Sequence, residues 1–132
     1  MSEKIGSDET FERGLQIRSE IMDPAPAGTA FETADKFMEP FQRLVGTYCW
    51  GEIWARPGLT RKVRSLLTVA MMAAANRPNE LRLHLKGAIN NGCSAEEISE
   101  TLLQVAVYSG VPAANEGLRI AREVLAEKSK SE

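Results

Sequence analysis

The stretch TRKVRSLLTVAMMAAA, from Thr60 to Ala75, decides the fold class of this chain. Thr60 supplies an N-cap hydroxyl, and the apolar residues after it recur at the i, i+3, i+4, i+7 spacing of one helical face. These residues are Val63, Leu66, Leu67, Ala70, Met71 and Ala74. Because the far end of the segment is apolar nearly all round, the pattern predicts a central buried helix.

Helical patterns also precede this stretch. A first helix is predicted over about 8–22 with Ser7 as its N-cap. Residues 23–28 contain two prolines and a glycine, which prevent a helix there. Thr29 caps a second helical stretch, in which Pro40 either kinks the helix or begins a new one. The apolar face of this stretch is predicted to consist of Phe37, Phe41, Leu44, Val45 and Tyr48.

Further helices are predicted after the opening stretch. One has Pro78 in its first turn and ends at Asn-Asn-Gly, 90–92. The next begins with the capping box Ser-Ala-Glu-Glu, 94–97, and is broken at 110–112. The last runs from about 113 to 127. The predicted inner faces are Leu81, Leu85, Ala88 and Ile89 in the first of these, and Ile98, Leu102, Val105 and Ala106 in the second.

The sequence therefore predicts an all-α fold, a single-domain bundle of about six helices over residues 1–132, with flexible tails at 1–7 and 128–132. The formal net charge of −2 argues against binding of nucleic acid through phosphate neutralisation. The N-terminus lacks the pattern of a signal peptide, and the longest apolar run, 66–75, is shorter than the about 20 residues of a membrane span. A soluble, cytoplasmic protein without a membrane partner is expected.

Cysteine placement bears on metals and cofactors. Cys49 and Cys93 form no C-x-x-C pair, and no second type of metal ligand clusters with them, so both are predicted to be small, semi-buried thiols. Because the sequence also lacks a Gly-rich phosphate loop and a G-x-S-x-G motif, no metal and no cofactor are expected. Any chemistry is then simple proton transfer or handling of carboxylates.

His84 is the only histidine of the chain. It shares a predicted helical face with Leu81, Leu85 and Ala88, so its side chain should point inward. One interpretation is a core residue that holds one hydrogen bond. The other is a general acid or base, since an imidazole pKa of about 6.5 suits proton transfer near neutral pH.

The segment RPGLTRKVR, 56–64, places three cations in the first turn of a helix, where the dipole favours acidic residues. They form either a solvated charged face with acidic partners elsewhere, or a site in which arginines and the helix N-terminus bind a carboxylate. Arg56, Arg61 and Arg64 are the candidates for such contacts.

The segment YCWGEIW, 48–54, gathers both tryptophans, a tyrosine and an acid. Such a cluster is either a core or subunit interface, or the wall of a pocket for a flat ring. Tyr48, Trp50 and Trp54 are the candidates for that wall. Glu52 is either an acid with a raised pKa or the salt-bridge partner of an arginine.

Taken together, these motifs resemble the 4-carboxymuconolactone decarboxylases over nearly the whole chain. The more specific stretches are WGEIWARPGL at 50–59 and YSGVPAAN at 108–115. The intervening 64–66, His84 and the glycine and acidic residues of 92–98 also fit the resemblance.

The wider superfamily is similar to the alkylhydroperoxidase D proteins, which share an all-helical fold and use a C-x-x-C-x-x-x-H motif. Counting back from His84, the two cysteine positions are Arg77 and Glu80 here, and the assisting glutamate maps near Ser65. The resemblance thus implies that thiol peroxidase or disulfide reductase activity of that type is absent, because no thiolate stands beside the histidine.

The resemblance implies a lyase of the protocatechuate branch of aromatic compound catabolism, the β-ketoadipate pathway. Loss of carbon dioxide from 4-carboxymuconolactone gives 3-oxoadipate enol-lactone. The lactone carbonyl accepts the electron pair as a dienolate, so the substrate carries its own electron sink and no cofactor is implied.

The same resemblance suggests roles for the candidates. His84 would deliver the proton or polarise the carbonyl. Arg61 and Arg64 would hold the carboxylate that stays or face the lactone oxygen, because a clamp on the leaving carboxylate would stabilise the ground state. Glu52, Tyr48 and Trp54 would shape the pocket and orient the histidine.

Two alternatives remain open at this point. The first is an enzyme of the same scaffold that acts on another small carboxylated lactone or a related acid. The second is a non-catalytic oligomeric binding protein, in which His84 is a core residue and the aromatic residues form an interface. The resemblance also implies a homo-oligomer, either a trimer or a hexamer.

Overall fold

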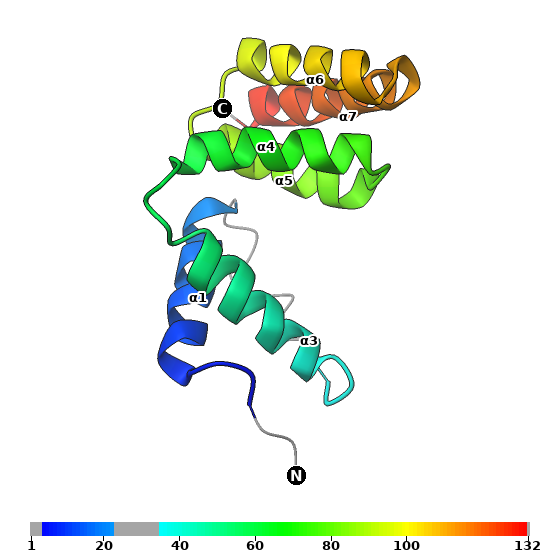
Figure 1. Cartoon of the computed structure of the whole chain (residues 1–132). Helices are drawn as coiled ribbons and strands as arrows, with labels where there is room; N and C mark the ends of the chain where they lie inside the picture. The colour runs from blue at the N-terminus through cyan, green and yellow to red at the C-terminus, as the bar shows by residue number, and fades with distance from the viewer. Residues whose placement is uncertain (1–3, 23–34, 132) are drawn as a thin grey trace. The chain divides into compact units, whose positions relative to one another are not determined.

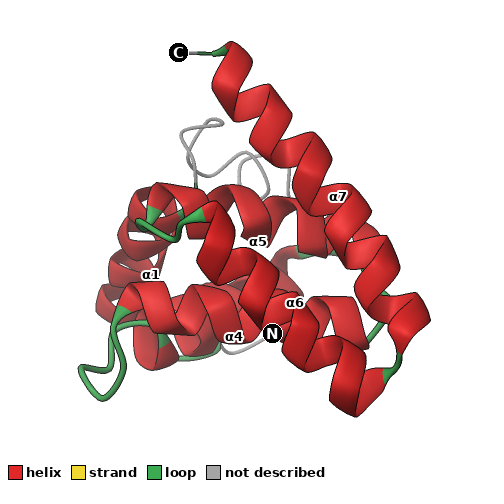
Figure 2. Ribbon diagram, turned by 90° about the horizontal axis from the view of Figure 1, so that it is seen from above, coloured by secondary structure: helices red, strands yellow, loops and turns green. Residues whose placement is uncertain are grey.

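The computed structural model describes residues 4–22 and 35–131, and every regular element within them is helical (Figures 1 and 2). These ranges hold six α-helices and one π-helix, in agreement with the predicted all-α class. None of these helices combines the length and the apolarity that crossing a bilayer requires. The chain forms two compact units, Met1–Leu59 and Thr60–Glu132, and each is described by itself. The single domain over 1–132 stays a prediction.

The first unit begins with α1 (Asp8–Ile21). The predicted N-cap is confirmed, because the Ser7 hydroxyl accepts a hydrogen bond of 3.1 Å from the backbone N–H of Thr10. Two acidic residues in the first turn and Arg18 in the last complement the helix dipole. The predicted break at 23–28 and the predicted cap at Thr29 lie outside the described residues.

The short helix α3 (Glu39–Leu44) runs directly into the π-helix η1 (Val45–Ile53). Pro40 lies in the first turn of α3, so of the two predicted possibilities the proline begins a helix. The predicted apolar face is largely exposed in this unit, with Phe37 at 87% and Phe41 at 58%. The buried face is instead formed by Trp50 and Trp54, which pack with residues of α1.

The close packing of α1 on η1 depends on glycines. A Cβ atom on Gly14 would lie 1.8 Å from the carbonyl oxygen of Gly46, and one on Gly51 would lie 2.5 Å from that of Thr10. Arg13 reaches across and donates two hydrogen bonds, of 3.1 and 3.0 Å, to the carbonyl of Gly51. That bond satisfies a carbonyl close to the C-terminal end of η1, where helical carbonyls lose their intrahelical partners.

The second unit packs four helices around one core: α4 (Arg61–Ala74), α5 (Pro78–Asn90), α6 (Ala95–Ser109) and α7 (Val111–Lys130). The predicted caps are confirmed, since the Thr60 hydroxyl accepts from Val63 N–H and both bonds of the Ser94–Glu97 capping box are present. The core consists mainly of Val69, Ala73, Leu81, Leu85, Ala88, Ile98, Leu102, Val105, Ile120, Ala121 and Val124. The predicted inner faces of α5 and α6 are therefore confirmed.

Two predictions about these helices are wrong. The last helix continues to Lys130 rather than ending at 127, and Lys128 and Lys130 in its last turn suit the negative end of the dipole. The fully buried residues of α4 are Ser65, Val69 and Ala73, which are not part of the predicted stripe. Within the stripe, Leu66 and Ala70 are only partly buried against the core, and Met71 is 59% exposed. Both faces of α4 carry small or apolar residues, so periodicity does not distinguish which of them is covered.

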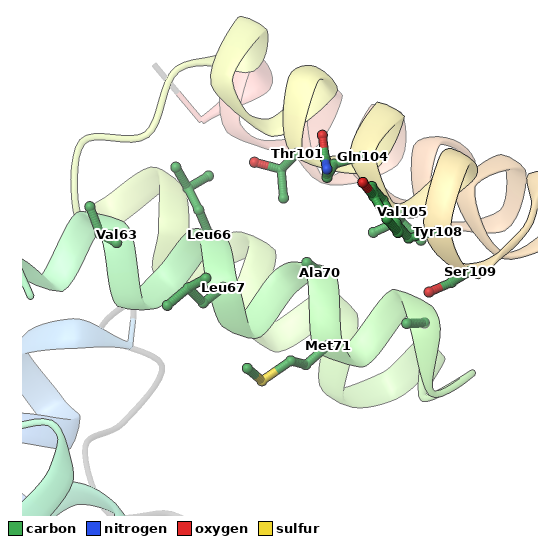
Figure 3. Close-up of a pocket in the computed structure, with 11 residues that line it drawn as sticks. Val63, Leu66, Leu67, Ala70, Met71, Thr101, Gln104, Val105, Tyr108 and Ser109 are labelled. Atoms are coloured by element: carbon green, nitrogen blue, oxygen red, sulfur yellow. The ribbon is translucent and has the colours of Figure 1, made fainter.

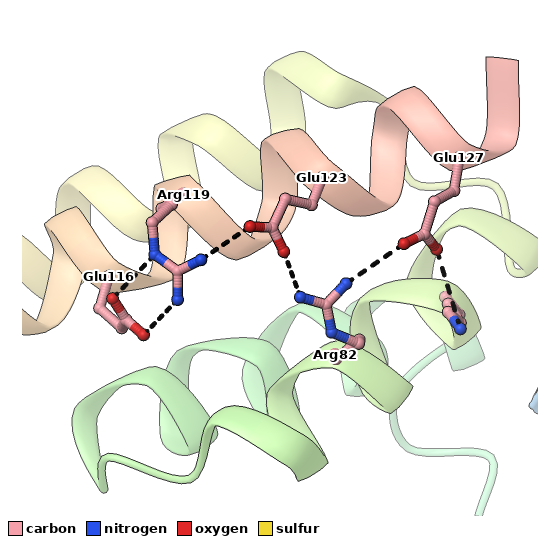
Figure 4. A network of polar contacts seen from close by, with 6 residues as sticks. Arg82, Glu116, Arg119, Glu123 and Glu127 are labelled. Carbon is pink, nitrogen blue, oxygen red and sulfur yellow. Dashed lines mark hydrogen bonds and ion pairs between the residues drawn. The ribbon is translucent and has the colours of Figure 1, made fainter. Parts of the chain in front are cut away.

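Arg82 links α5 to α7 through ion pairs with Glu123 and Glu127 (Figure 4). Glu123 also accepts from Arg119, at 2.7 Å, and Arg119 pairs with Glu116 at 2.6 Å. The hydrogen bond from Arg82 is the main cause that lowers the pKa of Glu123 below its ordinary value of 4.5. The charged form of this glutamate is therefore favoured in the folded state.

Stability should accordingly depend on pH through Glu123. Because its pKa is lowered on folding, its contribution is present above the unfolded value of 4.5 and is lost as the pH falls through the folded value. In a Glu123→Gln variant, we expect the melting temperature to decline less between about pH 6 and pH 3 than in the wild type. Since the pair is exposed, the difference should not exceed about 4 °C. Thermal melts monitored by circular dichroism, with Glu100→Gln as the control, measure it, and equal slopes in all three proteins would contradict the expectation.

Candidate functional site

The start of α4 carries the three predicted cations in different surroundings. Arg61 is exposed, Arg64 is half-buried, and Lys62 forms an ion pair of 2.8 Å with Glu97 of α6. This hydrogen bond raises the pKa of Lys62 and lowers that of Glu97. One of the three cations thus has an acidic partner on another helix. The two arginines remain the candidates for contact with a carboxylate.

His84 lies on the neighbouring helix α5 and is half-buried, less so than its predicted inward position implies. The register of the two helices is fixed by a hydrogen bond of 3.0 Å from the Asn91 amide to the hydroxyl of Ser65, which is 2% exposed. The N-terminal end of α4 therefore lies beside the C-terminal end of α5. His84 precedes Asn91 by seven residues, which is about 10 Å along the helix axis.

The structure thus brings Arg64 and His84 onto adjacent, antiparallel helices, although about two helical turns separate their positions along the axis. The pattern of residues does not reveal the Ser65–Asn91 pair that sets this register, since both residues are common at exposed positions. The one feature of the sequence that bears on this pair is the position of Asn91 at the predicted end of a helix.

The aromatic segment belongs to the first unit. Trp50 and Trp54 stack with ring centroids 5.1 Å apart and an interplanar angle of 24°, and they are 5% and 7% exposed. This burial favours the core interpretation over a pocket wall. Tyr48, which is 54% exposed, and Glu52 lie on the accessible side of η1, and Arg56 is exposed just after it. These three are polar side chains that a solute can reach.

Neither thiol is suited to act as a nucleophile. Burial is the main cause that raises the pKa of both Cys49 and Cys93 above the ordinary value of 9.0. Cys93 also donates a 3.6 Å hydrogen bond to the carbonyl of Lys62. Within residues 4–22 and 35–131, no group of three or more His, Cys, Asp or Glu side chains is placed to hold a metal ion.

Cavities of two different sizes lie in the described part of the second unit. The larger, of about 620 Å³, is an apolar groove between α4 and α6 (Figure 3). The smaller, of about 310 Å³, lies at the N-terminal end of α5 and is lined by Asn76, Arg77 and Glu116 among apolar residues. Its size suits a small ligand. Leu81 of α5 also lines it, whereas His84, Arg61 and Arg64 are not among its lining residues. Its polar lining residues, Asn76, Arg77 and Glu116, are not among the site residues predicted from the sequence.

Comparison with known proteins places these residues in a family. The pattern of the Carboxymuconolactone decarboxylase family matches residues 39–123, which include η1, the start of α4 and His84. The chain belongs to this family. The family match and the helices together confirm the predicted all-α, alkylhydroperoxidase D-like fold class.

Two proteins with similar sequences are named for the reactions that they catalyse. The chain is 36% identical over 120 residues to the 4-carboxymuconolactone decarboxylase of Acinetobacter baylyi. The aligned residues cover 91% of this chain and 90% of that protein. It is 37% identical over 115 residues to the nitrosuccinic acid decarboxylase of Metarhizium robertsii. This alignment covers 87% of this chain and 80% of that protein. Both are decarboxylases, which confirms the predicted enzyme class, a carboxy-lyase.

Proposed function

We propose that this family member is a cofactor-free decarboxylase that converts 4-carboxymuconolactone to 3-oxoadipate enol-lactone and carbon dioxide, in the β-ketoadipate pathway of aromatic catabolism. The observation that carries the proposal is the 36% identity to a 4-carboxymuconolactone decarboxylase over 90% of that protein. A cytoplasmic location and assembly as a trimer or hexamer are part of the same proposal.

The substrate supplies the driving force for this reaction. When the carboxylate leaves as carbon dioxide, its electron pair stays on a ring carbon that is conjugated to the lactone carbonyl. The carbonyl oxygen takes up the negative charge as a dienolate, and a proton then adds to the ring. The protein therefore has to bind a dianion, stabilise the charge that develops on the lactone oxygen, and deliver one proton.

The residues of the second unit suit these three tasks. His84, half-buried on α5, is the candidate proton donor. Arg64 and Arg61, at the N-terminal end of α4, are the candidates for binding the carboxylate that is not lost. Contacts to this carboxylate persist in the transition state, whereas contacts to the leaving carboxylate would stabilise the ground state. In the first unit, Tyr48, Glu52 and Arg56 stay candidates for substrate contact because the resemblance implies such a role and their side chains are exposed.

A second substrate has its own support. The relative from Metarhizium robertsii is named for nitrosuccinic acid, and the identity to it is 37%. Nitrosuccinate is also a dicarboxylate with a built-in electron sink, because the nitro group accepts the electron pair as a nitronate when the neighbouring carboxylate leaves. Decarboxylation of either substrate therefore requires the same functions of the protein: it holds one carboxylate, lets the other leave as carbon dioxide and donates a proton to carbon.

The proposal is tested by giving the purified protein both substrates. 4-Carboxymuconolactone is generated enzymatically in place because it is unstable, and its consumption is followed by ultraviolet absorbance, with carbon dioxide release measured in parallel. We expect kcat/KM at least about 100-fold higher for the lactone than for nitrosuccinate, a ratio that corresponds to about 2.7 kcal/mol. Preferred consumption of nitrosuccinate would replace the proposed substrate, and a folded protein that consumes neither would refute both.

A further inference from the structure

We infer that Ser65 and Asn91 are positioning residues for decarboxylation, because the hydrogen bond between them holds the arginines of α4 at one distance from His84. The Asn91 amide donates to the Ser65 hydroxyl at 3.0 Å. The inference rests on the proposed function, in which the arginines and the histidine act on the same substrate. It adds two residues that contact no substrate and act through the residues that do.

Each residue of the pair shares a helical face with a candidate site residue. Arg61 precedes Ser65 by four positions on α4. His84 precedes Asn91, the C-cap residue of α5, by seven positions. Residues four or seven positions apart lie on the same face of an α-helix. The bond therefore joins the face of α4 that carries an arginine to the face of α5 that carries the histidine.

The Ser65 hydroxyl is a polar group within the core of the second unit. The residue is 2% exposed and lies with Val69 and Ala73 on the buried side of α4. A buried hydroxyl without a hydrogen-bond partner is destabilising, whereas a satisfied one favours a single arrangement of its surroundings. The alignment of the two helices that brings Asn91 to this hydroxyl is therefore favoured over neighbouring alignments.

The apolar contacts between α4 and α5 control this alignment less strictly. Their attraction depends on the area removed from water and has no direction of its own. A hydrogen bond, in contrast, weakens steeply as its distance and angle change. The core residues that these two helices contribute are aliphatic, namely Val69, Ala73, Leu81, Leu85 and Ala88. The bond from Asn91 to Ser65 is thus the directional contact that sets the axial position of the arginines relative to His84.

Other contacts hold the same end of α4 when the pair is lost. Lys62 forms an ion pair of 2.8 Å with Glu97, and its carbonyl accepts a hydrogen bond of 3.6 Å from the Cys93 thiol. Neither contact reaches α5, because Cys93 and Glu97 follow that helix in the chain. Loss of the pair should therefore leave α4 bound to the second unit but able to shift along α5.

Such a shift would affect the chemical step more than substrate binding. In the proposed mechanism the arginines anchor the carboxylate that stays, so a displaced α4 still binds the substrate and carries it along. The reacting carbon then lies out of reach of His84. Because a misplacement of about 1 Å can slow a reaction about 100-fold, the loss should appear in kcat and not in KM.

The test compares steady-state kinetics of the wild type, Ser65→Ala and Asn91→Ala on whichever of the two named substrates the wild type prefers. We expect kcat to fall by about 10- to 100-fold in both variants, with KM changed by less than about threefold. Asn91 is half-buried at a helix end, so its variant keeps the test valid if Ser65→Ala does not fold. Thr101→Val is the matched control and should keep wild-type turnover, because the 2.8 Å bond of that hydroxyl stays within α6.

A second comparison separates positioning from a general structural effect. In a His84→Ala background, Ser65→Ala should lower kcat by no more than about twofold further, because the pair acts through the histidine. An equal loss in both backgrounds, or wild-type kcat in folded Ser65→Ala and Asn91→Ala proteins, would overturn the inference alone. A wild type that consumes neither substrate would refute the proposed function, and the inference with it.

Discussion

Replacement of His84 by alanine is expected to lower kcat for decarboxylation by a factor of about 10² to 10⁴, with KM changed by less than about threefold. The reason is that His84 is proposed to act on the proton that is transferred after carbon dioxide leaves, and not on the carboxylate that anchors the substrate. Loss of a proton donor removes an interaction made in the transition state alone, so it appears in kcat. Steady-state kinetics with 4-carboxymuconolactone generated in place measure both constants.

Two further variants make this result interpretable. His84→Gln keeps a hydrogen-bonding side chain at the half-buried position but cannot exchange a proton near neutral pH, so it should be nearly as slow as the alanine variant. Leu83→Ala, at an exposed position of the same helix, should retain wild-type turnover. Wild-type kcat in a folded His84→Ala protein would remove the histidine from the mechanism. Full activity in His84→Gln would assign it a positioning role through hydrogen bonding.

Replacement of Gly14 by alanine is expected to destabilise the first unit by about 3 kcal/mol, the upper end of the range for overpacked sites. The added Cβ would lie 1.8 Å from the carbonyl oxygen of Gly46, and backbone on both sides leaves no flexible side chain to move aside. The helices α1 and η1 would therefore have to separate. Because both tryptophans of the chain, Trp50 and Trp54, lie in this core, urea denaturation followed by tryptophan fluorescence reports on it directly.

Gly58→Ala is the matched control for this prediction. Apart from its two chain neighbours, no described residue has an atom within 4 Å of the position that its Cβ would occupy. The substitution should therefore change the unfolding free energy by no more than about 0.5 kcal/mol. If Gly14→Ala unfolds at the same urea concentration as the control, the close approach of α1 and η1 is not a feature of the protein in solution.

The sequence by itself determined the features that depend on neighbouring residues. The caps at Ser7, Thr60 and Ser94 were predictable because an N-cap bonds to backbone only two or three positions ahead. The positions of the helices followed from apolar periodicity, and the family from stretches such as 50–59. His84 was singled out in the same way, as one reactive side chain on a helical face.

Only the tertiary structure decided which of several possible faces is buried. The apolar stripe of α4 predicted the helix correctly, but Ser65, Val69 and Ala73 face the core, since the neighbouring helices pack closest where side chains are small. Periodicity identifies an apolar face and carries no information about what covers it. The apolar stripe instead lines a groove between α4 and α6, with Leu66 and Ala70 partly buried against the core.

The same holds for the candidate site and for the π-helix. The bond between Ser65 and Asn91 joins residues 26 positions apart and sets the distance between the arginines and His84 along the two helices. Gly14 of α1 lies close to the backbone of Gly51 in η1. The neighbouring Arg13 donates to the Gly51 carbonyl, although these two residues lie 38 positions apart in the chain. Local sequence specifies caps, helices and reactive side chains, whereas their spacing is set by contacts between distant residues, because those contacts exist only once the helices have packed.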